Sequence, residues 1–171
     1  AVPLPFEMSY VPAGTKVVST APGRKPGLSF ETKYPVLGVS ANSGFGDGLH
    51  TMVESANDQG LSLSTNQMPG SQSPVGAGSD AAKALAATDL AIYLLGNFKS
   101  VAEVKEALTS GAVSVWLPKA PLLGNLEFPM HYILFDRTGA GIVIEYLDGK
   151  QSIYDNPVGV ATNAPDFGWH L

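Results

Sequence analysis

The 171 residues have the length of one globular domain, with a net charge of −5, 15% charged residues and 44% hydrophobic residues. A chain of this size buries roughly 70% of its unfolded surface, so we predict a single folded domain over residues 1–171. The sequence has no cluster of lysine and arginine, which argues against a nucleic-acid partner. Its longest apolar runs are far too short to span a bilayer, which argues against a membrane span.

The sequence contains no cysteine. This excludes disulfides, thiolate metal sites and a cysteine nucleophile within these residues. Residues 1–5 have neither the basic region nor the long apolar region of a signal peptide. The chain stops on the large side chains of Trp169, His170 and Leu171, whereas natural termini are usually polar and frayed. We therefore expect a domain that is truncated at both ends.

The first third of the chain predicts short strands separated by turns. Apolar and polar residues alternate in these segments, and proline and glycine lie between them. The predicted strands are Phe6–Val11, Lys16–Ser19, Leu28–Tyr34, Val36–Ala41, Met52–Ser55 and Leu61–Asn66. The last two form a hairpin around residues 57–60.

A loop and a helix are predicted next. Met68–Ser79 is rich in glycine, serine and proline and low in charge, which is typical of an exposed loop beside a site. Ser79 and Asp80 then cap a helix over Ala81–Leu95, and Gly96 ends it.

A second helix and a second group of strands complete the chain. Ser100 and Glu103 form a capping box, and the helix that they begin ends at Gly111. The strands predicted after it are Val113–Leu117, Met130–Phe135, Ile142–Tyr146, Ser152–Tyr154 and Val158–Thr162. Strands, then two adjacent helices, then strands indicate an α+β fold with a largely antiparallel sheet.

Most of the familiar catalytic patterns are missing. The glycine-rich stretch Gly44–Gly48 lacks the Rossmann and Walker spacings, and we interpret it as a loop. His50, His131 and His170 lie far apart outside any zinc motif, and we predict that His131 is a buried, hydrogen-bonded residue. The carboxylates in or beside hairpins are expected to serve turns and cross-strand pairs. These carboxylates are Glu54, Asp58, Asp136, Glu145 and Asp148.

Two side-chain amides at strand ends are the remaining candidates. Asn163 follows the predicted strand Val158–Thr162 and precedes Ala164-Pro165, while Gln67 precedes the glycine-rich loop. From the residues alone, either amide is interpreted as a strand-end cap or an Asx-type turn residue.

Four short motifs occur in a fixed order along the chain. They are Asn57-Asp58-Gln59-Gly60-Leu61, His131-Tyr132 with Asp136-Arg137-Thr138-Gly139, Val143-Ile144-Glu145-Tyr146-Leu147-Asp148-Gly149, and Val160-Ala161-Thr162-Asn163-Ala164-Pro165. This order resembles the choloylglycine hydrolase and penicillin V acylase family. The family patterns read N-E-K-G-L, H-y-x-x-x-D-x-x-G, V-I-E-Y-x-D-G and T-N-x-P-x-F. The resemblance extends over residues 6–171.

The resemblance implies an αββα N-terminal-nucleophile hydrolase fold, of which this chain is an interior part. In that family a cysteine at the processed N-terminus attacks a linear amide, and its own α-amine acts as the base. An arginine and an aspartate shortly after the cysteine position the amine. All three precede the present sequence, so we expect the 171 residues alone to be inactive.

The same resemblance implies roles for two residues of this chain. Asn163 matches the asparagine of T-N-x-P, whose amide helps to form the oxyanion hole. Gln67 falls where family members carry asparagine, tyrosine or another residue near the oxyanion and the substrate. Glutamine is a departure from the family at this place, and Asn66 is the alternative.

The resemblance implies hydrolysis of an acyl-amide small molecule without a cofactor or metal, by a monomer or a homo-oligomer. The sequence leaves the compartment open, and a bacterial cytoplasm or periplasm would suit the family. Two alternatives stay open. One is a non-catalytic family member that serves binding or assembly, and the other is an N-terminal-nucleophile hydrolase that cuts peptides or lactams.

Overall fold

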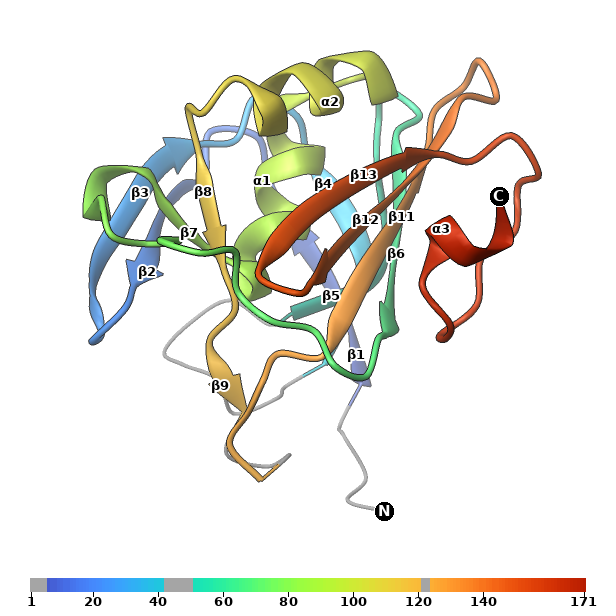
Figure 1. Ribbon diagram of the computed structural model, residues 1–171. Coiled ribbons are helices and arrows are strands. Elements are labelled where there is room, and N and C mark those ends of the chain that lie inside the picture. Colours follow the sequence, from blue (N-terminus) through green and yellow to red (C-terminus); the bar gives the residue numbers. More distant parts are fainter. Residues whose placement is uncertain (1–5, 42–50, 121–123) are drawn as a thin grey trace.

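A large antiparallel sheet organises the computed structural model, which describes residues 6–41, 51–120 and 124–171 (Figure 1). Its seven strands have the order β1-β4-β5-β6-β11-β12-β13. Their bounds are Phe6–Val11 (β1), Val36–Ala41 (β4), Thr51–Asn57 (β5), Ser62–Gln67 (β6), Met130–Phe135 (β11), Gly141–Leu147 (β12) and Lys150–Asp155 (β13). Each neighbouring pair is antiparallel.

Three small two-stranded sheets accompany the large one. β2 (Lys16–Ala21) and β3 (Lys25–Glu31) form an antiparallel hairpin. β7 (Ala84–Ala86) pairs in parallel with β8 (Ser114–Trp116). β9 (Lys119–Ala120) pairs with β10 (Leu126–Glu127).

The helices lie on both faces of the large sheet. α1 (Leu90–Asn97) and α2 (Val101–Thr109) cover one face, and α1 lies between this face and the β2–β3 hairpin (Figure 1). The short α3 (Phe167–His170) covers part of the opposite face. Within the described residues, none of the helices has the length and apolar character that crossing a membrane requires.

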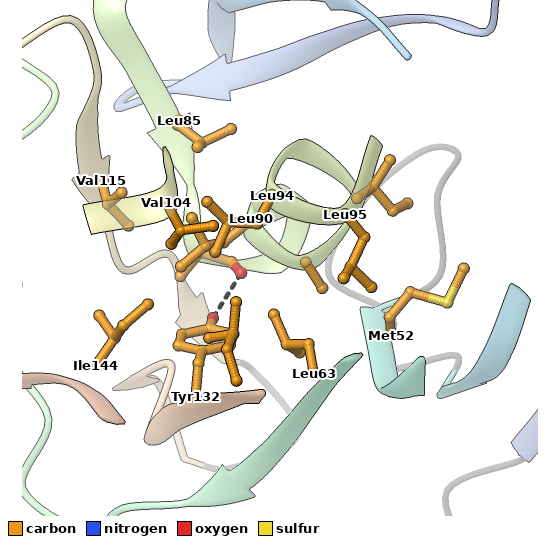
Figure 2. Packing of buried hydrophobic residues seen from close by; sticks show 14 of the residues in the cluster. Met52, Leu63, Leu85, Leu90, Leu94, Leu95, Val104, Val115, Tyr132 and Ile144 are labelled. Atoms are coloured by element: carbon orange, nitrogen blue, oxygen red, sulfur yellow. Dashed lines mark hydrogen bonds between the residues drawn. The ribbon is translucent and has the colours of Figure 1, made fainter. Parts of the chain in front are cut away.

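The main core fills the space between the sheet and the first two helices. Buried side chains of α1, including Leu90, Leu94 and Leu95, pack against Leu63 of β6 and Tyr132 of β11 (Figure 2). The Tyr132 hydroxyl donates a 2.6 Å hydrogen bond to the buried carbonyl of Ala87. This bond lets a polar atom enter the apolar core without losing its hydrogen-bonding partner.

A second, smaller cluster lies on the opposite face of the sheet. Ile133 and Val143 pack there against Phe167 of α3, and Ala161 is half-buried against them. Side chains alternate between the two faces of a strand. Consequently β11 sends Tyr132 to the main core and its neighbour Ile133 to this second cluster.

Most predicted strands are confirmed, including β1, β4 and β11 with the predicted bounds. The predicted helix Val101 onwards is also confirmed, and Ser100 accepts a hydrogen bond from the Glu103 N–H as a cap. The α+β prediction with a largely antiparallel sheet is correct.

The single helix predicted over Ala81–Leu95 is wrong in its first half. Residues 81–83 and 87–89 form 3₁₀ turns around the short strand β7, and only Leu90–Asn97 is α-helical. The Ser19 hydroxyl accepts from the Ala86 N–H and donates to the Asp89 carboxyl. These hydrogen bonds, together with the β8 pairing, outweigh the helical preference of the alanines.

The strand predicted over Val158–Thr162 is also wrong. The Asn156 side chain accepts a 2.9 Å hydrogen bond from the Gly159 N–H, which turns the chain directly after β13. Val158 and Val160 are left exposed, and the chain crosses to the face that carries α3.

Replacing the buried tyrosine tests the main core. Tyr132→Phe removes one of two donors to the buried Ala87 carbonyl, which keeps the bond from the Leu90 N–H, so we expect a loss of about 1–1.5 kcal/mol in the free energy of unfolding. Urea titration of the full-length protein measures it. Tyr146→Phe is the control: its hydroxyl bonds the half-buried Gln151, which water can reach, so the loss should stay below about 1 kcal/mol. Equal losses in the two variants would contradict this account.

Candidate functional site

A buried histidine–glutamate pair lies on the face of the sheet that carries α3. His131 Nδ1 of β11 is 3.2 Å from Oε1 of Glu145 on β12, and both side chains are 1% exposed. The prediction of a buried, hydrogen-bonded His131 is therefore confirmed. A carboxylate only accepts hydrogen bonds, so the Nδ1 nitrogen carries the shared hydrogen.

The same carboxylate holds the start of α3. The Phe167 N–H donates to both oxygens of Glu145, at 3.0 Å to Oε1 and 3.1 Å to Oε2. Phe167 is 2% exposed and packs against Ile133 and Val143. Backbone and side chain of this one residue are thus both fixed to the sheet.

Asn163 lies in the segment that these contacts hold. Ala161 packs against the second cluster before it, and Phe167 is anchored after it. Asn163 itself is exposed, and its amide makes no hydrogen bond to the part of the chain that the structure describes. The peptide bond Ala164-Pro165 is cis. A free side-chain amide therefore projects from a short segment that is fixed on both sides.

Gln67 is the last residue of β6, as predicted, and its side chain is exposed. Its neighbour Asn66 is half-buried and lies directly opposite His131 in the strand register. Because strand side chains alternate, Asn66 shares the face of His131, and Gln67 shares the face of Thr65. The two candidate amides of this strand end thus leave the sheet in opposite directions.

Asn57 has a structural role. The buried Asn57 amide donates to the carbonyls of Leu95 and Phe98 at the end of α1, at 2.7 and 2.8 Å. Its oxygen accepts from the N–H groups of Gln59 and Leu61, both at 3.0 Å. All the strong hydrogen-bonding capacity of this amide is used to join the β5–β6 turn to α1.

Asp136 has a comparable structural role at the start of α2. Its carboxylate accepts from the Val101 N–H at 3.0 Å and from the N–H and hydroxyl of Thr138. Burial alone would raise the pKa of this carboxyl, but these hydrogen bonds outweigh it and hold the pKa below its ordinary value. Asp136 joins the β11–β12 turn to α2, which confirms the predicted turn role and extends it.

The loop Met68–Ser79, which is predicted to lie beside a site, contacts the segment 118–129. The Ser73 N–H donates to the Glu127 carboxylate of β10, and the Leu117 N–H donates to the Ser73 hydroxyl. The loop Met68–Ser79 is thereby tied to the segment 118–129. The glycine-rich stretch Gly44–Gly48 and His50 lie outside the described residues.

A sequence model of the linear amide C–N hydrolases of the choloylglycine hydrolase family matches residues 10–171. The chain belongs to this family. The bile salt hydrolase/transferase of Clostridium perfringens is 30% identical over 162 residues, which are 95% of this chain and 46% of that protein. The conjugated bile acid hydrolase of Lactobacillus acidophilus is 32% identical over 147 residues, or 82% of this chain and 42% of that protein.

Solved structures of this hydrolase family share the fold. The conjugated bile acid hydrolase of Clostridium perfringens superposes with a TM-score of 0.73 at 28% identity, over 96% of this chain and 47% of that one. Penicillin V acylase of Agrobacterium tumefaciens gives a TM-score of 0.76 at 23% identity, over 96% and 46%. The predicted N-terminal-nucleophile hydrolase fold is confirmed, and the chain spans about half the length of the relatives that it matches.

The sequence predicts only a hairpin role for Glu145 and does not identify its contact with Phe167. The sequence does indicate that Glu145 is unusual. It is the charged residue in an otherwise apolar strand, Gly141–Leu147, and this strand is buried along nearly all its length. A charged residue in such a strand needs hydrogen-bond partners, which the sequence does not identify.

Asp136 provides a pH test of its capping contacts. Because its folded pKa lies below the unfolded one, its contribution to stability is complete above the unfolded value and is lost as pH falls through the folded one. Asp136→Asn cannot ionise. We expect the variant to be less stable at pH 7 and the gap to close as pH drops below about 4. Urea titrations between about pH 7 and pH 3 measure the gap, and a pH-independent gap would contradict this assignment.

Proposed function

We propose that the full protein hydrolyses the C–N bond of a linear amide in an acylated small molecule, with an N-terminal cysteine as nucleophile. The observation that carries the proposal is the Asn163 amide, which is exposed, unpaired among the described residues and fixed at both ends of its segment. The family membership of the chain supports the reaction class. In this proposal residues 1–171 form part of a larger hydrolase domain.

The proposed chemistry needs a donor that meets a negative oxygen. The cysteine thiol transfers its proton to the α-amine, and the sulfur attacks the amide carbon, which moves an electron pair onto the carbonyl oxygen. The Asn163 amide N–H groups bind that oxyanion in our proposal. The intermediate then collapses, the C–N bond breaks, and the departing amine takes the proton; water later releases the acyl group from sulfur.

Pre-organisation is the physical reason for choosing Asn163. An oxyanion donor is effective when it is already oriented and does not have to break another bond first. The side chain of Asn57 fails this test, because it already bonds four backbone groups of the protein. Asn163 has no such bond to break within the described residues, and its backbone lies between Ala161 and Phe167, which both pack on the sheet.

The proposed substrate has an apolar acyl or aromatic group. The segment 118–129 carries Pro118, Pro121, Leu122 and Leu123, and its described part is tied to the loop Met68–Ser79. Relatives are named for bile salts and for penicillin V, the latter in Pectobacterium atrosepticum at 28% identity over 84% of this chain and 38% of that protein.

Removing the proposed donor tests the proposal. In the full-length protein, Asn163→Ala should lower kcat and kcat/KM by about 10²–10³-fold and leave KM nearly unchanged, since the bond is made mainly in the transition state. Amine release from a panel of acyl amides measures the kinetics. Thermal melting of the same sample is the control. A near-normal kcat with a clear loss of stability would assign Asn163 to a turn and remove it from the site.

The strand end of β6 gives a second test. We propose Gln67 as the further amide near the oxyanion on the strength of the family resemblance, since it is exposed at the end of β6, whereas Asn66 is the residue that shares the sheet face of the Asn163 segment. Gln67→Ala should lower kcat by about tenfold or more, in the direction expected for a lost hydrogen-bond donor. Asn66→Ala is the matched neighbour on the other face of the strand. A larger effect from Asn66→Ala would transfer the role to Asn66.

A further inference from the structure

We propose that Glu145, braced by His131, is a positioning residue that holds the Asn163 segment in its active geometry. This inference rests on the proposed oxyanion role of Asn163. The structure supports it because the buried Glu145 carboxylate binds both His131 and the backbone N–H of Phe167, which follows Asn163 by four residues.

The hydrogen bonds of Glu145 leave its carboxylate little freedom. Oε1 accepts from His131 Nδ1 at 3.2 Å and from the Phe167 N–H at 3.0 Å, while Oε2 accepts from the same N–H at 3.1 Å. Both side chains of the pair are 1% exposed, so water does not compete with these bonds. The carboxylate therefore fixes the Phe167 backbone relative to β11 and β12.

The path from this contact to Asn163 is short. Phe167 follows Asn163 by four residues, and the intervening Asp166 caps the turn by accepting from the Trp169 N–H at 3.1 Å. Ala161, two residues before Asn163, packs on the same cluster as Phe167. Asn163 therefore projects from a segment whose ends both depend on the β11–β12 pair.

Asp136 offers a matched comparison on the same hairpin. It is also a buried carboxylate that accepts from a backbone N–H at the start of a helix, but that helix is α2. The contacts of Asp136 do not reach residues 161–167. We therefore expect the removal of Asp136 to lower stability and to leave the Asn163 segment in place.

The experiment is a double-mutant cycle of Glu145→Ala and Asn163→Ala in the full-length protein. For each variant we would measure kcat and KM on an acyl amide that the wild type hydrolyses, and the free energy of unfolding. Glu145→Ala should lower kcat by about 10²-fold at nearly constant KM, as expected for a misplaced group. In the Asn163→Ala background the same change should lower kcat by less than about twofold, because the group it positions is gone. Its effect on stability should be the same in both backgrounds.

Conservative variants keep the test decisive if Glu145→Ala does not fold. Glu145→Gln keeps the side-chain length, so its oxygen can accept from Phe167 while its NH₂ meets Nδ1 of the other His131 tautomer. It should retain most of kcat. Glu145→Asp keeps the charge but is one methylene shorter, and it should lose more. Asp136→Ala is the control and should lose stability with a wild-type kcat.

Three results would overturn the inference. The first is an equal fall in kcat from Glu145→Ala with and without Asn163. The second is a wild-type kcat in Glu145→Asp together with a low kcat in Glu145→Gln. In that case the charge of the side chain at position 145, and not its length, would determine kcat. The third is a normal kcat for Asn163→Ala, which removes the proposed oxyanion role together with the positioning role. If Asn163→Ala lowers kcat and Glu145→Ala lowers it by the same further factor in that background, only the positioning role of Glu145 is removed.

Discussion

Strand β11 pairs with β6 on one side and with β12 on the other, so it joins the early strands of the sheet to the late ones. The alternation of its side chains imposes the main constraint on the molecule. Tyr132 and Leu134 have to fit the core beneath α1 and α2, while His131 and Ile133 have to fit the segment that ends in α3. One six-residue strand therefore fixes both layers, and a shift of one residue in its register would exchange them.

Polar residues make this two-sided arrangement specific. Asn57, Asp136 and Glu145 each carry a buried or nearly buried side chain from a strand or hairpin to the backbone of a helix end. A buried carboxylate or amide is costly unless it is fully hydrogen-bonded, so each of these contacts is favourable in one arrangement of helix and sheet only. Apolar packing brings the helices onto the sheet, and these three contacts determine where their ends lie.

The sequence predicts those parts of the molecule that depend on local pattern. Strands with clear alternation, such as β1 and β4, and the helix capped by Ser100 follow from their own residues. The helix predicted over Ala81–Leu95 fails because Ser19, far away in sequence, bonds Ala86 and Asp89. At the site, a buried His131 can be predicted from its strand. The partnership of Glu145 with Phe167 cannot, since it depends on how the chain returns across the sheet after Asn156.

The family motifs of this chain differ in whether their polar side chains have hydrogen-bond partners within the protein. In the first motif the Asn57 amide forms all its strong hydrogen bonds within the protein. In the second motif both carboxylate oxygens of Asp136 accept hydrogen bonds within the protein. The last motif differs, because the Asn163 amide has no partner within the described residues and yet its segment is held on both sides. A polar group that is held in place but left unpaired can bind a developing charge at little reorganisation cost, whereas a satisfied one cannot. Satisfied hydrogen bonds therefore distinguish Asn57 and Asp136, which join elements of the fold, from Asn163, whose amide is unpaired among the described residues.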